Sequence, residues 1–168
     1  CRGNTKWLTY DKKEFKKKKS WESNGVHLHF PVGSIIITDE VHKCKGYTSL
    51  NSDFLVACKN HGYKLLMMSA TAATNPLELK ALGFVANLHT GYNFSKFCKS
   101  GGAETNRFGG LTINMSSDKA KQGMVEVHNS LFNLQSSASR MTVDMFKGIF
   151  PENHVTAETF DMGQNTDK

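Results

Sequence analysis

The stretch Ile35-Ile36-Ile37-Thr38-Asp39-Glu40-Val41-His42 passes directly from an apolar run into charged side chains. Further along the chain, Leu65-Leu66-Met67-Met68 passes in the same way into Ser69-Ala70-Thr71. Short apolar runs of this kind are typical of buried strands in a parallel sheet. Ligands of such sheets bind outside the carboxyl ends of the strands. The sequence therefore predicts an α/β fold in which both polar clusters lie at the same rim.

The residue types at this rim suit metal-assisted phosphoryl transfer. An aspartate at a strand end, here Asp39, can hold Mg²⁺ directly or through water. The next carboxylate, Glu40, can polarise an attacking water. His42 and the hydroxyl groups of Ser69 and Thr71 can form hydrogen bonds across the gap between the two loops. An Asp-Glu pair alone is also ordinary turn chemistry, but the two clusters together, in this order, favour the functional interpretation.

Asp39-Glu40-Val41-His42 resembles motif II, in its DExH form, of the superfamily 2 helicases and nucleic-acid translocases, and Ser69-Ala70-Thr71 resembles their motif III. The resemblance implies a partial RecA-like (P-loop NTPase) lobe, with parallel strands flanked by helices. It implies ATP and Mg²⁺ as cofactors and a nucleic acid as partner. In this family pattern Asp39 is the magnesium ligand, Glu40 and His42 belong to the catalytic site, and Ser69, Ala70 and Thr71 couple the nucleotide state to the nucleic acid.

Parts of such an enzyme have no counterpart in the 168 residues. The phosphate-binding motif G-x-x-x-x-G-K-[ST] is absent, since none of the 14 glycines is followed by lysine. Motifs of a second lobe are absent too. We therefore expect a fragment, with a basic flanking segment at 1–33, the later part of lobe one at 34–152 and a connection toward lobe two at 153–168. The phosphate loop and the second RecA-like lobe are expected elsewhere in the same protein.

A second resemblance concerns the region before the expected connection. Ser139-Arg140-Met141-Thr142-Val143-Asp144, followed by Phe150-Pro151-Glu152, is similar to the segment that closes lobe one in chromatin-remodeller-type translocases. It favours DNA over RNA as the track. The same residues also suit an amphipathic helix with Met141, Met145 and Ile149 on one face. The alternative function, from a different class, is a non-hydrolysing nucleic-acid-binding module that keeps the strand core.

The formal net charge of +6 belongs to one end of the chain. Residues 1–20 hold eight basic and two acidic side chains, a difference of six, and the remaining residues are neutral in sum. Lys16, Lys17, Lys18 and Lys19, with Phe15 and Trp21 nearby, suit contact with a phosphate backbone. The alternative is a solvated face, and neither interpretation implies sequence-specific recognition.

The four cysteines, Cys1, Cys44, Cys58 and Cys98, have spacings that fit neither a zinc site nor a disulfide framework. Free thiols favour an intracellular compartment, cytoplasmic or nuclear, which for a viral or phage protein is the host cell. No apolar stretch reaches the roughly 18 residues of a membrane span, so no membrane partner is expected.

The remaining pattern predicts further elements around the two strands at 34–38 and 63–68. A helix is expected at 49–61 with Gly62 as its terminator, and another beginning at Asn75 with Glu78 completing a capping box. A long amphipathic helix is expected at 117–134, with His128 at the core or its boundary. Residues 91–115 suit a short helix and a glycine-bracketed loop without assigned function, and 155–162 alternate as in a strand.

Overall fold

The computed structural model describes residues 5–11, 21, 25–45, 49–134, 138–146 and 148. These residues form a mixed α/β structure that divides into two units, 1–138 and 139–168, and each unit is described by itself. Four features predicted from the sequence lie outside the described residues, namely the run Lys16–Lys19, the Phe150-Pro151-Glu152 step, the connection at 153–168 and, within it, the strand at 155–162.

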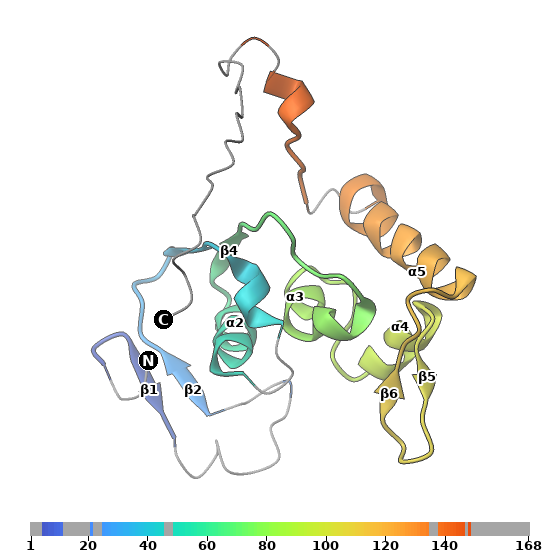
Figure 1. Cartoon of the computed structure of the whole chain (residues 1–168). Helices are drawn as coiled ribbons and strands as arrows, with labels where there is room; N and C mark the ends of the chain where they lie inside the picture. The colour runs from blue at the N-terminus through green and yellow to red at the C-terminus, as the bar shows by residue number, and fades with distance from the viewer. Residues whose placement is uncertain are drawn as a thin grey trace, which may run out of the picture. The chain divides into compact units, whose positions relative to one another are not determined.

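The first unit contains the predicted strand–helix–strand segment (Figure 1). Strand β3, Ile35–Thr38, pairs in parallel with β4, Lys64–Met67, and the register runs from Ile35 opposite Lys64 to Thr38 opposite Met67. Between them lie the 3₁₀ turn η1, Val41–Cys44, and helix α2, Leu50–Asn60. The predicted parallel pairing is confirmed, and so is the connecting helix.

Local chemistry at both ends of α2 explains its length. The side chain of Ser49 accepts a hydrogen bond from the backbone N–H of Ser52, which satisfies a donor that the first turn leaves unpaired. At the other end the chain turns through Gly62, whose φ of 74° lies in the left-handed region that glycine adopts without steric cost. The helix buries Leu55 and Cys58 completely, so it supplies the centre of the core.

The expectation that both strands are buried is wrong for alternate residues of each strand. Ile35 is 61% exposed, Ile37 is 60% exposed and Leu66 is 50% exposed. The alternate residues Ile36 and Leu65 pack against the core cluster that contains Ala57 and Cys58 of α2. Successive strand residues point to opposite faces, so one face of this two-stranded sheet meets α2 and the other is open among the described residues.

Two antiparallel hairpins were not predicted. Strand β1, Leu8–Tyr10, pairs with β2, Val26–Leu28, and β5, Glu104–Thr105, pairs with β6, Leu111–Thr112. Leu8, Val26 and Leu28 are buried and belong to the same core cluster as Ala57 and Cys58 of α2. Part of the basic flanking segment therefore contributes to the core.

The rest of the first unit is helical: η2 (Pro76–Leu79), α3 (Lys80–Val85), α4 (Phe94–Ser100), α5 (Asp118–Asn129) and the π turn η3 (Ser130–Leu134). The predicted helix at 117–134 is thus an α-helix that ends in a π turn. Its buried residues are Ala120, Gly123 and Val127. The expected place of His128 at the core or its boundary is wrong, because its side chain is exposed and contacts the ring of Phe132, with centroids 4.6 Å apart.

The second unit is described over 139–146 and at residue 148. It contains one 3₁₀ turn, η4, Val143–Phe146, rather than a longer helix within that range. Met141 and Met145 are 76% and 68% exposed. Across the described part of both units, no helix has the length and apolarity needed to cross a membrane.

Candidate active site

Backbone hydrogen bonds bring the loops that follow β3 and β4 together. The N–H of Met68 donates to the carbonyl of Thr38 over 2.9 Å, and the N–H of Val41 donates to the carbonyl of Met68 over 3.0 Å. These bonds extend the pairing of the strands beyond their last residues. The two polar clusters therefore begin at the same rim of the sheet, which is the juxtaposition expected from parallel strands.

Glu40 has an unusual backbone at this rim. Its φ of 52° and ψ of 45° lie in the left-handed region, which costs a residue with a side chain roughly 1–2 kcal/mol. Two bonds hold it there: the carboxylate of Asp39 accepts from the N–H of Glu40 over 2.8 Å, and the N–H of Lys43 donates to the Glu40 carbonyl over 2.9 Å. Both carboxylates are exposed at the start of η1. Strained backbone of this kind persists where surrounding bonds determine it.

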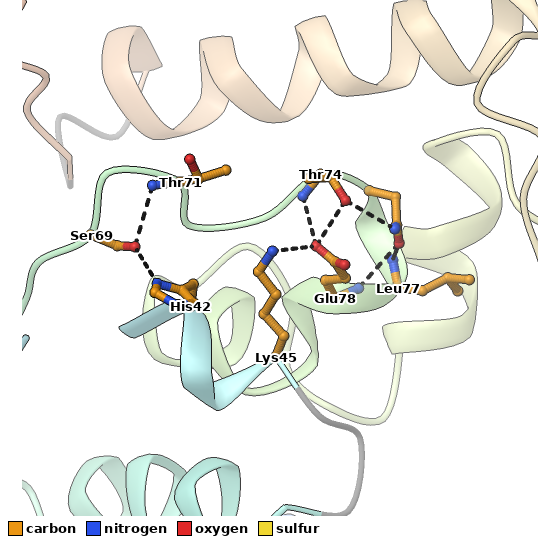
Figure 2. Close-up of polar contacts among 8 residues, drawn as sticks. His42, Lys45, Ser69, Thr71, Thr74, Leu77 and Glu78 are labelled. Carbon is orange, nitrogen blue, oxygen red and sulfur yellow. Dashed lines mark hydrogen bonds and ion pairs between the residues drawn. The ribbon is translucent and has the colours of Figure 1, made fainter. Parts of the chain in front are cut away.

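His42 connects the two loops, as Figure 2 shows. Its Nδ1 lies 2.9 Å from Oε2 of Glu40 and 3.2 Å from Oγ of Ser69. A carboxylate only accepts hydrogen bonds, so this geometry assigns a proton to Nδ1 and shares it between the two oxygens. Oγ of Ser69 also accepts from the N–H of Thr71 over 3.3 Å. A continuous polar chain thus runs from Glu40 to Thr71, while Ala70 is exposed between them.

A second bridge joins the same two segments and was missed in the sequence (Figure 2). Nζ of Lys45 lies 3.1 Å from Oε2 of Glu78, and the same oxygen accepts from the N–H and the hydroxyl of Thr74 over 2.7 and 3.1 Å. Partial burial alone would raise the pKa of Glu78. The bonds from Thr74 and the charge of Lys45 outweigh it and hold that pKa below its usual value.

The start of η2 agrees in part with the predicted capping box. Oδ1 of Asn75 accepts from the N–H groups of Leu77 and Glu78 over 3.0 and 3.3 Å, as expected of the cap. The side-chain carboxylate of Glu78, however, accepts from the N–H of Thr74 rather than from the N–H of Asn75, as a capping box would require. The reason is that Thr74 offers two donors to one carboxylate oxygen, and this places Glu78 within reach of Lys45.

The exposed carboxylates at the rim are oxygen ligands of the type that Mg²⁺ accepts. Mg²⁺ usually keeps several waters and uses one or two carboxylates together with phosphate oxygens. The exposed carboxylate of Asp39 is a donor of that kind. Among the described residues there is no group of three or more His, Cys, Asp or Glu side chains that could form a closed metal cage.

The remaining candidate residues do not join this site. Cys44, Cys58 and Cys98 are buried free thiols, and burial raises the pKa of both Cys58 and Cys98 to about 12. They are therefore poor nucleophiles near neutral pH. Lys16–Lys19 lie outside the described residues, so their predicted phosphate contacts stay a prediction.

A cavity of about 420 Å³ lies elsewhere in the first unit, lined by Lys59, Phe84, Asn87, Leu88, His89, Thr90 and Asn93. Its polar groups are already engaged. The Lys59 ammonium donates to the carbonyl of Phe84 and, over 2.7 Å, to Oδ1 of Asn87. Nε2 of His89 donates to the carbonyl of Leu79, and Nδ1 accepts from the N–H of Gly91. Among the described residues, those lining this cavity included, no buried side-chain nitrogen or oxygen lacks a hydrogen-bond partner.

Comparisons of the chain with protein-family models, with curated protein sequences and with solved structures found no match.

Proposed function

We propose that this chain is part of the first RecA-like lobe of an ATP-dependent helicase or translocase that moves on nucleic acid, with DNA favoured over RNA. The observation that carries the proposal is the contact between His42 and Ser69, 3.2 Å long, which joins the polar ends of two adjacent parallel strands. A polar turn after one strand needs no hydrogen-bond partner in the loop after the neighbouring strand. Mechanical coupling of the two loops at this rim does need such a contact.

In the proposed reaction each rim residue has a distinct role. Asp39 binds Mg²⁺ directly or through water, and Glu40 orients the attacking water and accepts its proton. Bound Mg²⁺ neutralises charge on the phosphates. The hydrogen bond from His42 holds the carboxylate of Glu40 in place. The left-handed backbone of Glu40 sets the direction in which this side chain leaves the main chain.

The same contacts suit transmission from the nucleotide to the nucleic acid. A shift of η1 acts on Ser69 through His42, and on Glu78 through Lys45. Ser69 lies in the loop that follows β4, and Glu78 lies in η2, which leads directly into α3. We propose that Ser69, Ala70 and Thr71 are the coupling loop and that the Lys45–Glu78 pair supports it.

The proposal needs groups for which the 168 residues contain no motif. We assign the phosphate-binding loop and the second RecA-like lobe to other parts of the same protein. Contacts with the nucleic-acid backbone are assigned to Lys16, Lys17, Lys18 and Lys19. The missing phosphate-loop motif also favours a second candidate, a nucleic-acid-binding module that does not hydrolyse ATP.

Replacing Glu40 by Gln in the full-length protein tests the proposal. We expect turnover to fall by about 10²- to 10⁴-fold, the usual contribution of a general base, while nucleotide binding stays near normal because the amide keeps the shape. Asp39→Ala should also weaken Mg²⁺-dependent binding. Glu126→Gln makes the same chemical change on α5 and serves as control.

Steady-state hydrolysis with and without nucleic acid, and nucleotide titration, provide the measurements. Normal turnover by Glu40→Gln would remove Glu40 from the proposed role. Absence of turnover in the unmodified full-length protein would favour the binding module. The 168-residue chain alone is expected not to hydrolyse ATP.

A further inference from the structure

The hairpin formed by β5 and β6 carries an exposed aromatic side chain at its tip. Phe108 is 80% exposed, more than any other Phe, Tyr or Trp that the structure describes. The guanidinium carbon of Arg107 lies 4.7 Å from the centre of its ring. Cations at this distance from an aromatic face are attracted by its negative charge density. The tip therefore presents an exposed aromatic ring with a cation over one of its two faces.

The tip is held in one conformation by its own hydrogen bonds. Oδ1 of Asn106 accepts from the N–H groups of Phe108 and Gly110, each over 2.9 Å. The N–H of Asn106 donates to the Gly110 carbonyl over 2.8 Å, and the N–H of Gly109 donates to the Asn106 carbonyl over 3.0 Å. Gly109 has a φ of 78°, which this loop needs. The free energy needed to order the tip for a partner is therefore small.

The base of the hairpin is fixed to the helices. Ala103 is 2% exposed, and Leu111 and Ile113 pack on the cluster that contains Phe94 and Cys98. Figure 1 shows the tip extending beyond α4 and α5. Phe108 is therefore carried on a firm support but does not belong to the core that supports it.

The segment around the hairpin is positively charged. Residues 91–122 hold five basic and two acidic side chains, an excess of three, although the chain after residue 20 is neutral in sum. Lys96 and Lys99 on α4, and Lys119 and Lys121 on α5, are exposed. Lys121 pairs with Asp118 over 3.6 Å, and the other three lie on the same two helices that flank the hairpin. This charge favours an anionic partner.

We propose that the β5–β6 tip binds single-stranded nucleic acid, with a base stacked on Phe108 and the backbone phosphates against Arg107 and the lysines of α4 and α5. The choice of partner class rests on the proposed function. A rigid aromatic ring beside cations is the combination that binds single strands without sequence preference, because every base has a face on which to stack. The hairpin adds a contact separate from the rim of β3 and β4.

Binding of the 168-residue chain to a fluorescently labelled oligodeoxythymidine, without nucleotide, tests the proposal. Phe108→Ala should weaken binding about fivefold to tenfold, at the lower end of the range for one stacked base. Phe108→Leu should weaken it nearly as much, since leucine is apolar but has no π face, whereas Phe108→Trp should keep it. Val125→Ala removes an exposed apolar side chain of α5 and should change nothing. Unchanged thermal unfolding verifies that each variant folds.

Two further variants separate stacking from charge and from tip order. Arg107→Gln should flatten the salt dependence of binding by about 0.7 for each phosphate that the arginine neutralises, whereas Phe108→Ala should leave that slope unchanged. Asn106→Ala removes the acceptor that orders the tip and should weaken binding although it leaves Phe108 in place.

Several results would overturn the proposal: no binding of the oligonucleotide, equal binding by Phe108→Ala and the unmodified chain, or Phe108-dependent binding to phosphatidylserine vesicles in place of the oligonucleotide. The assay contains no nucleotide, so its result is independent of hydrolysis. Glu40-dependent turnover together with Phe108-independent binding would reject the hairpin contact and retain the proposed function. Phe108-dependent binding in a full-length protein without turnover would retain the hairpin contact and reject the proposed ATP hydrolysis.

Discussion

The rim of β3 and β4 and the tip of the β5–β6 hairpin are both polar loops, but they are built by opposite means. At the rim, the deciding contact joins His42 to Ser69, 27 residues apart in the chain. At the tip, Asn106 bonds to partners two and four residues away. The geometry of the rim therefore depends on the whole core, whereas that of the tip depends on its own residues and a firm base. A substitution in the core should therefore disturb the rim, and a substitution at the base of the hairpin should disturb the tip, each without the other.

The largest expected effect on the free energy of unfolding comes from a substitution in α5, Gly123→Ala, next to the base of the hairpin. A Cβ at position 123 of α5 would lie 2.6 Å from the carbonyl carbon and 2.8 Å from the carbonyl oxygen of Gly101, which are backbone atoms that cannot rotate away. Alanine usually stabilises a helix relative to glycine by about 0.5–1 kcal/mol. Overpacking typically costs about 1–3 kcal/mol. We expect Gly123→Ala to lower the free energy of unfolding in urea by about 1–2 kcal/mol.

Gly83→Ala is the matched control for this change. It is also a helical position, but its Cβ would meet the ring of His89 at 3.1 Å, and a side chain can shift by a few tenths of an ångström. Its cost should therefore be smaller. Hydrogen exchange should show reduced protection around Gly101 in Gly123→Ala and intact protection at Met68. Equal reductions at both positions would mean that rim and hairpin respond as one unit.

The strand–helix–strand core could be predicted because its signals are local and strong. The apolar runs, the serine cap and Gly62 each determine the backbone within a few residues. The hairpins escaped prediction because their strands are two or three residues long, too short to show alternation. The exposure of Ile35 and Ile37 escaped it because an apolar run does not reveal how many of its faces are covered.

The candidate site was predictable to the same limited extent. The motifs predicted that Asp39, His42 and Ser69 lie at one rim, and the parallel pairing of β3 and β4 explains why they do. The bridge from Lys45 to Glu78 was not predicted, because it depends on the reach of a long side chain across a tertiary contact. The left-handed backbone of Glu40 has no sequence signal either, since glutamate is not enriched in that conformation.

An intermediate effect is expected from His89, which lies in the core among the rings of Phe84, Phe94 and Phe97. Burial lowers its pKa, and the charge of Lys59 lowers it further, although the hydrogen bond to the Leu79 carbonyl opposes this. The unfolded chain therefore takes up this proton first as pH falls below about 6.5. Stability contributed by neutral His89 is lost on acidification, with a slope of at most about 1.4 kcal/mol per pH unit.

Urea unfolding at several pH values between about 7 and 5, the range in which an ordinary histidine titrates, measures this slope. His89→Gln keeps a donor and an acceptor but does not titrate, so its free energy of unfolding should depend less on pH in that window. A slope as steep as that of the unmodified chain would show that other groups cause the loss. This result bears on the comparison of the two regions. As pH falls, the stability contributed by His89 between α3 and α4 should be lost at a higher pH than the stability contributed by Glu78 at the rim.

The smallest expected effects belong to the two side-chain bridges at the rim, and the larger of the two is expected for Lys45 and Glu78. Since the pKa of Glu78 is lowered in the folded chain, the unfolded chain binds this proton first, and the contribution of Glu78 is lost as pH falls below about 4.3. The Lys45 and Glu78 side chains are 24% and 28% exposed, so solvent screens the pair and its coupling should be about 0.2–1 kcal/mol.

A double-mutant cycle with Lys45→Met and Glu78→Gln at neutral pH measures that coupling directly. Thr74 keeps two donors for the amide oxygen of the substituted side chain, so most of the loss should come from the charge of Lys45. The cycle for His42→Asn and Ser69→Ala should give a smaller coupling, because His42 is 40% exposed and shares one proton between two acceptors. If the His42–Ser69 coupling proved larger, the contact that carries the proposed function would also be the main mechanical link of the rim. If both were zero, the loops would be held by the backbone bonds of Val41 and Met68 alone, and the contrast with the self-ordered hairpin tip would lose its side-chain basis.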